Sequence, residues 1–218
     1  MPGPLSDVNR HRLPEFSRLP SAGPFIGLCV NNGYDNSKMT RFQLEHIIRA
    51  AAEIADDDPI IVIGSQAILG EFPDAPDVLL VSMEADVYPL NKPERADLID
   101  GTIGEGSPFH ELYGYYAQGV GPKTAILPAG WQSRLVRVQN PNTRQHAGLC
   151  LEVHDLVISK YVANRPKDID FVQNAIRYQL IEKTVLLARL DDTPLAEPQR
   201  QIIAQKIKRD FAGAGSKI

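Results

Sequence analysis

The chain has 218 residues, 43% of them hydrophobic and 23% charged, with a formal net charge of −4, which suits one medium domain or a compact core with a small appended lobe. No stretch approaches the ~20 apolar residues that cross a bilayer, and the N-terminus lacks the basic-then-apolar pattern of a secretion signal, so we expect a soluble cytoplasmic protein with no membrane partner. The chain has only two cysteines, Cys29 and Cys150, and its five His residues show no HExxH spacing, which excludes a disulfide framework and argues against a zinc hydrolase.

Residues 1–38 are rich in Pro, Gly, Ser and Asn, a composition that favours a flexible tail or strap. Within this segment, the short apolar run Phe25–Val30 is a candidate edge strand. Order is expected from Thr40, because Thr-Arg-Phe-Gln has the form of a capping box. Apolar residues follow at helical spacing until the acidic run Asp56–Asp58 and Pro59, so a helix is predicted between these points.

A strand, a turn and a second strand are expected next. Ile60–Ile63 is a short, fully apolar run and predicts a buried strand. Gly64 and Ser65 then lead into a brief helical stretch over 66–71. After a loop, the segment Val78–Val87 has the strongest strand character in the chain.

The middle of the chain, residues 89–130, contains many Gly and Pro residues and predicts irregular structure. Two further strands are predicted over Leu135–Val138 and Leu149–Val153. The glycines of the middle segment are interpreted as turn residues, since they follow a loop rather than an apolar strand: Gly101, Gly104 and Gly106.

From His154 onward the apolar period is helical. Helices are predicted over 155–164, after a cap at Asp168, over 183–190 and over 197–211. The expected fold class is α/β (α+β), with a small mixed sheet flanked by helices. The expected division is a tail or strap over 1–38, a core over 39–153 and a helical C-terminal lobe over 154–218.

Charge is unevenly distributed along the chain. Residues 1–152 carry 12 Lys and Arg against 19 Asp and Glu, a net charge of −7, whereas residues 153–218 carry 11 against 8, a net charge of +3. The net-acidic chain is a poor general binder of polyanions, because such binding depends on many basic contacts to phosphates. The basic C-terminal third is still suited to a triphosphate or a short stretch of RNA.

The second predicted strand carries two acidic residues, Glu84 and Asp86. Because side chains alternate along a strand, both project from one face, ~7 Å apart at the backbone. Carboxylates at this spacing can converge on Mg²⁺, which prefers oxygen ligands and often shares them with phosphate. As the alternative, an acidic pair on a strand is often only a solvated edge face.

Gly64 and Ser65 come between the first strand and a helix. Free backbone N–H groups and the positive end of the helix dipole favour a phosphate at such a point, and Ser65 adds a hydroxyl donor. As the alternative, a Gly-Ser pair here is commonly an ordinary helix cap. A phosphate seat beside a metal-binding carboxylate pair is the minimum equipment for phosphoryl or nucleotidyl transfer.

This order of Gly-Ser, helix and acidic strand resembles the nucleotidyltransferase superfamily, whose signature is Gly-Ser followed by a strand with D-x-D. The segments His154–Tyr161 and Ala163–Asp168 resemble the "DL…K…GRxKD" helix pair of bacterial nucleotidyltransferases, including AbiEii-like toxins and an uncharacterised nucleotidyltransferase family. The resemblance covers roughly 40–190. The chain departs from the pattern in having Glu84 as its first acid and in a long interval between Ser65 and that acid.

The resemblance implies roles for individual residues. Gly64 and Ser65 would hold the phosphates of an NTP, and Glu84 and Asp86 would bind Mg²⁺ or Mn²⁺. Lys160 would neutralise triphosphate charge, and Asp168 would support the metal or orient Lys160. Without a ligand, Lys160 is a partner of the helix dipole and Asp168 a helix cap.

Further candidates are less well defined. Arg165 and Lys167 add positive charge near the site, and Arg165 is assigned to nucleotide binding. Glu152 is the candidate third metal carboxylate, with Asp155 interpreted as a helix cap. Aromatic residues near the acidic and basic groups of the middle segment could stack a base or simply pack within the fold: Tyr113, Tyr115, Tyr116 and Trp131, near Asp97, Asp100, Glu105 and His110.

The sequence therefore predicts a Mg²⁺-dependent nucleotidyltransferase that moves an NMP from an NTP to an acceptor. By the resemblance, the acceptor is RNA, such as a tRNA end, or a protein side chain, and the setting is a toxin–antitoxin or phage-defence system with a protein antitoxin as partner. Two alternatives stay open. One is a nucleotide-binding pseudoenzyme or partner-binding module of the same fold, and the other is a structural interaction protein.

Overall fold

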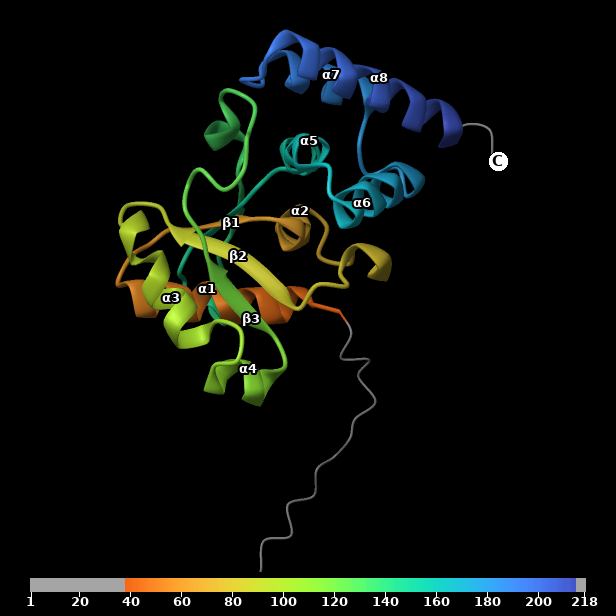
Figure 1. Ribbon diagram of the computed structural model, residues 1–218. Coiled ribbons are helices and arrows are strands. Elements are labelled where there is room, and N and C mark those ends of the chain that lie inside the picture. The colour runs from red at the N-terminus through yellow and green to blue at the C-terminus, as the bar shows by residue number, and fades with distance from the viewer. Residues whose placement is uncertain (1–37, 215–218) are drawn as a thin grey trace, which may run out of the picture. The chain divides into compact units, whose positions relative to one another are not determined.

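The computed structural model describes residues 38–214 (Figure 1). The expected tail over 1–38, apart from Lys38, and the candidate strand Phe25–Val30 lie outside the described residues. None of the helices between residues 38 and 214 is long and apolar enough to span a membrane. The helices are α1 (Arg41–Ala55), α2 (Ile68–Glu71), α3 (Ala96–Ile103), α4 (Pro108–Tyr113), α5 (Val153–Ala163), α6 (Pro166–Arg177), α7 (Lys183–Asp191) and α8 (Glu197–Ala214).

Five strands form one mixed sheet in the order β3-β2-β1-β5-β4. Figure 1 labels β1, β2 and β3 of this sheet. The central strand β1 pairs antiparallel with β2 and parallel with β5, and the outer pairs are parallel for β2 with β3 and antiparallel for β4 with β5. The carboxyl end of β1 therefore lies beside the amino ends of β2 and β3. The strands are β1 (Ile60–Ile63), β2 (Glu84–Pro89), β3 (Tyr116–Gly119), β4 (Val136–Val138) and β5 (Gly148–Cys150).

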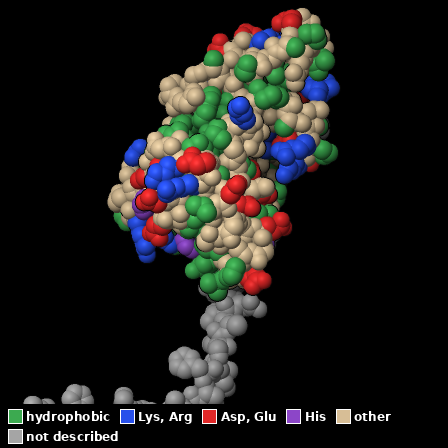
Figure 2. All heavy atoms as spheres, turned by 60° about the vertical axis from the view of Figure 1, so that its left-hand side comes forward, with side chains coloured by type: hydrophobic (Ala, Val, Ile, Leu, Met, Phe, Trp, Pro, Cys, Tyr) green, Lys and Arg blue, Asp and Glu red, His purple; other side chains and the backbone are tan. Residues whose placement is uncertain are grey.

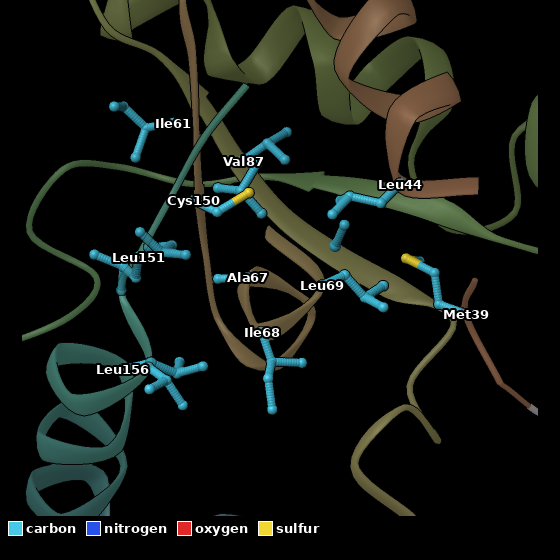
Figure 3. Packing of buried hydrophobic residues seen from close by; sticks show 14 of the residues in the cluster. Met39, Leu44, Ile61, Ala67, Ile68, Leu69, Val87, Cys150, Leu151 and Leu156 are labelled. Atoms are coloured by element: carbon cyan, nitrogen blue, oxygen red, sulfur yellow. The ribbon is translucent and has the colours of Figure 1, made fainter. Parts of the chain in front are cut away.

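The hydrophobic core joins the sheet to the helices around it. All four residues of β1 are buried, as expected for a central strand covered on both faces. Figure 3 shows Cys150 and Val87 from the sheet gathered with the α2 residues Ile68 and Leu69, and with Leu156 from α5. Packing in the core thus fixes the positions of the turn after β1, the strand β2 and the helix α5 relative to one another.

The first predicted helix and strand are confirmed. Thr40 is the N-cap of α1, and its reciprocal hydrogen bonds with Gln43 form a complete capping box. The helix ends at Asp56 in a left-handed conformation, because the acidic run and Pro59 cannot continue it. Strand β1 has the predicted bounds Ile60–Ile63.

The strand predicted over Val78–Val87 is only half correct. Residues Asp77–Leu79 form a 3₁₀ turn, and β2 begins at Glu84. The prediction was wrong here because the continuous apolar run does not show which of its residues are buried. In the structure Leu79 and Leu80 are both buried, whereas Val78 and Val81 are exposed. Two adjacent buried residues fit a turn that closes over the core and do not fit the alternation of a strand.

The middle segment is more regular than predicted. It contains the helices α3 and α4 and the strand β3. Gly101 lies inside α3, whereas Gly104 follows its last residue and Gly106 has a positive φ of 73° in the next turn. The helix α3 is stabilised by packing of Ile99 and Ile103 into the core. Composition does not reveal such packing, so it cannot distinguish a glycine inside this short helix from a glycine in a turn.

The C-terminal helices have nearly the predicted bounds, but their caps differ. Glu152, not Asp155, is the N-cap of α5, where its side chain accepts from the backbone N–H of Asp155. Arg165 is the N-cap of α6, and Asp168 is its third helical residue, with a carboxylate that accepts from the backbone N–H of Arg165. Helix α5 packs against both α6 and α7, and α8 packs against α6 and α7.

The surface shows no large area of a single charge sign on the face drawn in Figure 2. Acidic and basic side chains are interspersed there, with hydrophobic side chains between them. This agrees with a small net charge of −4. The candidate site described below is a local cluster of charged residues.

Candidate active site

The candidate site begins where β1 ends beside the start of β2. The antiparallel register pairs Ile63, the last residue of β1, with Asp86. The next residue is Gly64, with a φ of 72°, and a Cβ added to it would lie 1.9 Å from Oδ2 of Asp86. Only glycine fits at this point, because any side chain would displace the Asp86 carboxylate and disfavour the backbone conformation. The turn and the carboxylate therefore share one location.

The two strand carboxylates lie on the same face of β2. Glu84 and Asp86 are half-buried, whereas Ala85 and Val87 between and after them are fully buried in the core. This alternation is the one that the sequence predicted for a strand with one polar face. Neither oxygen of Asp86 accepts a hydrogen bond from a backbone N–H or a basic side chain of the described residues.

The environment of Asp86 disfavours its charge. Burial is the largest cause and the negative charge of Glu84 the second, and together they raise the pKa of Asp86 to about 6. Lys160 and Lys167 act in the opposite direction but do not cancel the effect. Two neighbouring acidic groups with no ion pair to a basic side chain among the described residues are what a divalent cation would stabilise.

Lys160 reaches the site from α5. Its Nζ lies 2.9 Å from Oγ of Ser65 and 3.2 Å from Oδ1 of Asp168, and it sits over the ring of Phe171 at 4.7 Å from the centroid. Burial is the main cause that lowers the pKa of Lys160, and the adjacent Asp168 carboxylate opposes it. The lysine is thus held between the Gly-Ser turn and two side chains of α6.

Asp168 orients this lysine from α6. It is fully buried and lies 2.7 Å through Oδ2 from Nε of Arg165. Burial would raise the pKa of Asp168, but the hydrogen bonds from Arg165 and the charge of Lys160 hold it below its ordinary value. Because both its oxygens are already occupied by cations, Asp168 is an orienting residue for Lys160 in this arrangement.

The structure does not bring Glu152 to the carboxylate pair. Its Oε1 lies 2.5 Å from Nδ1 of His154, and its other oxygen caps α5. Between residues 38 and 214 there is no group of three or more Asp, Glu, His or Cys residues that could hold a metal ion. Glu84 and Asp86 are left as two carboxylates on one strand face, which are oxygen donors of the kind that hard divalent cations take.

Some aromatic residues of the middle segment pack against one another, and one of them contacts the candidate site. Tyr113 and Tyr115 lie in a ring cluster with His46 and Phe109, and the hydroxyl of Tyr115 is 2.7 Å from Nδ1 of His46. Tyr116 is different, because its hydroxyl is 3.5 Å from Oε2 of Glu84. Burial, followed by the charge of Glu84, raises the pKa of Tyr116 to about 12, so the hydroxyl keeps its proton at neutral pH.

Trp131 and the acidic candidates of the middle segment lie elsewhere. Trp131 lines an open cavity of about 370 Å³ together with Asp191 at the end of α7 and Asp192 after it. His110 packs on the ring of Tyr116, with 4.6 Å between the ring centroids. Asp97 and Asp100 are exposed on α3, and Glu105 is exposed after it.

Gln66 is a residue of the site region that sequence reasoning missed. It is fully buried, and its Nε2 donates to the carbonyl of Ser82 at 2.7 Å. Ser82 in turn accepts, through Oγ, from the backbone N–H of Glu84 at 3.2 Å. These bonds connect the Gly-Ser turn to the start of β2. The polar Gln next to Ser65 was the only sequence signal, and it does not identify a partner.

The five-stranded mixed sheet thus brings together a Gly-Ser turn, a strand carboxylate beside it and a lysine on the turn hydroxyl. The family described as "Nucleotidyltransferase of unknown function (DUF6036)" matches residues 42–212, so the chain belongs to this nucleotidyltransferase family. Neither the comparison with curated proteins nor that with solved structures gives a match.

Proposed function

We propose that the protein transfers a nucleoside monophosphate from an NTP to an acceptor and releases pyrophosphate, with Mg²⁺ or Mn²⁺ as cofactor. The observation that carries this proposal is the closeness of Asp86 to Gly64, where a Cβ would lie 1.9 Å from the carboxylate. A phosphate on the turn would therefore lie within reach of a cation held by the strand. A bound cation would supply charge neutralisation for the phosphates and for the attacking oxygen.

Each residue of the site has a defined task in this proposal. The backbone N–H groups after Gly64 and the hydroxyl of Ser65 bind phosphate oxygens. Lys160, whose Nζ lies 2.9 Å from that hydroxyl, adds a positive charge on the leaving phosphates. Glu84 and Asp86 hold the cation, and Asp168 keeps Lys160 aimed at the turn.

Arg165 and Lys167 stand at the edge of this arrangement. Both are exposed on the first turn of α6 and just before it, and the charge of Lys167 lowers the pKa of Asp86 through space. Their exposed cations suit the outer phosphates of an NTP or the backbone of an acceptor. The acceptor we propose is RNA, such as a tRNA end, or a protein side chain. We place the activity in a toxin–antitoxin or phage-defence setting, with a protein antitoxin as partner.

The test is transfer of label from each of four α-³²P NTPs to total RNA and to protein, with the full chain and Mg²⁺. We expect labelled acceptor with wild type and a loss of at least about a hundredfold with Asp86→Asn, because this substitution removes one of two cation ligands. Asp97→Asn is the matched control, since it makes the same change at an exposed carboxylate on α3.

The alternatives give different results in the same preparation. A pseudoenzyme would be thermally stabilised by an NTP with Mg²⁺ yet transfer no label. A structural interaction protein would show neither effect. Absence of transfer from all four NTPs, with wild type and Asp86→Asn melting as folded proteins, would contradict the proposed enzymatic function.

A further inference from the structure

The strand β3 extends the acidic face of β2 toward the edge of the sheet. The two strands pair in parallel, and the register places Tyr116 opposite Glu84 and Gln118 opposite Asp86. Directly paired residues of neighbouring strands point to the same face of a sheet. Tyr116 and Glu84 therefore lie side by side on the face that carries the proposed cation site.

The side chains of this pair are in contact. The hydroxyl of Tyr116 lies 3.5 Å from Oε2 of Glu84, and among residues 38–214 no other hydroxyl and no basic side chain hydrogen-bonds to the Glu84 carboxylate. The separation exceeds the 2.7–2.8 Å typical of an O–H···O bond, and the contact involves one of the two carboxylate oxygens. The other oxygen has no such donor among the described residues and is available to a cation.

The ring of Tyr116 is itself held in place. His110 from α4 packs on it at 4.6 Å between ring centroids. The Nδ1 of His110 accepts from the backbone N–H of Gly106 at 3.0 Å, so the imidazole is anchored to the turn before α4. The middle segment, α4 and β3 together, thus presents a fixed hydroxyl to Glu84.

A glutamate at this position needs such a restraint more than an aspartate does. Its additional methylene adds a rotatable bond, and fixing a longer side chain on a metal costs more conformational entropy. Groups that hydrogen-bond to a ligating carboxylate reduce this cost by fixing its orientation before the metal binds. The first acid of the pair is Glu84, where the family signature that the sequence resembles has Asp.

We propose that Tyr116 is a positioning residue, whose hydroxyl donates to Glu84 and holds this longer carboxylate beside Asp86 for the divalent cation. The inference rests on the proposed function, because it assigns a task within the same cation site. It adds that the middle segment is a functional part of the site.

The test measures Mn²⁺ binding to the full chain without nucleotide, by titration with electron paramagnetic resonance of free Mn²⁺. Tyr116→Phe should weaken binding about tenfold, the lower part of the range seen when such supporting groups are removed. Tyr115→Phe is the matched control. It removes a hydroxyl from the neighbouring tyrosine, whose partner is His46 in the ring cluster, and it should leave Mn²⁺ affinity unchanged.

A second comparison separates positioning from a general structural role. In a Glu84→Asp background the shorter carboxylate should no longer depend on the hydroxyl, so adding Tyr116→Phe should change Mn²⁺ affinity by less than about twofold. This is a double-mutant cycle, in which the two residues couple only if one acts through the other. Melting temperatures of all variants verify that each is folded.

Two results would overturn the inference. One is equal Mn²⁺ affinity of wild type and Tyr116→Phe. The other is the same loss from Tyr116→Phe in the wild-type and the Glu84→Asp backgrounds, which would mean that the hydroxyl acts on the fold and not on the carboxylate. The failure of the proposed function has a separate signature. If folded wild type binds no Mn²⁺ and Asp86→Asn behaves identically, the cation site itself is refuted, and the positioning role with it.

Discussion

The position of Asp86 disfavours its charged form and so lowers the stability of the folded protein at neutral pH. Burial and the neighbouring Glu84 raise its pKa to about 6, from 3.8 in a free side chain. The folded protein therefore binds a proton here more tightly than the unfolded chain does. By linkage, this residue costs stability progressively as the pH rises from about 4 to about 6, and the cost stays constant above that.

This linkage predicts how Asp86→Asn changes thermal stability in metal-free buffer. Because the amide carries no charge, the variant should melt higher than wild type at pH 7, with a stabilisation on the order of 3 kcal/mol for a pKa raised from 3.8 to about 6. The difference should shrink toward zero at pH 4, where the wild-type carboxyl is also neutral. Calorimetric melting of both proteins at four pH values between 4 and 7.5 provides the measurement, and a difference independent of pH would contradict it.

The pair Tyr115 and Tyr116 shows what a sequence cannot assign at the residue scale. Tyr115 directly precedes β3 and Tyr116 is its first residue, yet the first packs against His46 and the second contacts Glu84. Alternation along an extended chain predicts opposite faces. It does not say which face meets the core, because that depends on the pairing of β3 with β2.

At the scale of elements, the turn after β1 is the part of the fold most constrained by the site. Gly64 combines a φ of 72° with an Asp86 carboxylate 1.9 Å from an added Cβ, whereas Gly106 has a φ of 73° with no heavy atom within 4 Å of an added Cβ. The two glycines share a positive φ and differ in whether an added side chain would meet another residue.

We expect Gly64→Ala to destabilise the protein by about 3 kcal/mol or more, and Gly106→Ala by about 1 kcal/mol. Both substitutions place a side chain on a left-handed backbone, but only the first displaces a carboxylate. Urea denaturation followed by circular dichroism gives the two free energies of unfolding. Equal losses in the two variants would mean that Asp86 moves aside without cost.

The elements that local signals define were predicted well, and those that packing defines were not. The capping box at Thr40 and the fully apolar β1 gave the correct ends for α1 and β1. The helices α3 and α4 have 8 and 6 residues, and helices this short are stabilised by their neighbours rather than by their own propensity. For this reason the middle segment was predicted to be irregular.

At the scale of the whole molecule, a buried ion cluster links the C-terminal helices to the loop before β4. Asp155 on α5 is fully buried, and Arg134 binds it with both Nε and Nη2, at 2.8 and 3.0 Å. Arg189 from α7 lies 3.3 Å from the same carboxylate. Burial raises the pKa of Asp155, and the charge and hydrogen bonds of Arg134 oppose that rise.

Asp155→Asn should therefore lower the free energy of unfolding by about 3–5 kcal/mol, because it leaves two guanidinium groups facing a neutral side chain in a largely buried place. Asp170→Asn, at an exposed carboxylate on α6, should change it by less than about 0.5 kcal/mol. Urea denaturation of the three proteins tests this. A small effect at Asp155 would show that the cluster opens to water at little cost.

The sequence by itself determined the class of fold and the polar face of β2, and it supplied the candidate site residues. Gly64, Ser65, Glu84 and Asp86 stand in local patterns whose physical meaning does not depend on distant parts of the chain. The approach of Lys160 to Ser65, 95 positions earlier, was suggested only by resemblance, and its 2.9 Å contact is a tertiary fact.

Only the tertiary structure decided which polar residues share the site. It placed Tyr116 beside Glu84 through the register of two strands separated by the whole middle segment, and it gave Glu152 to the cap of α5 instead of to the carboxylate pair. The physical reason is that charge and hydrogen-bonding capacity belong to a residue, whereas strand pairing and the burial of a helix face result from packing between segments far apart in the chain.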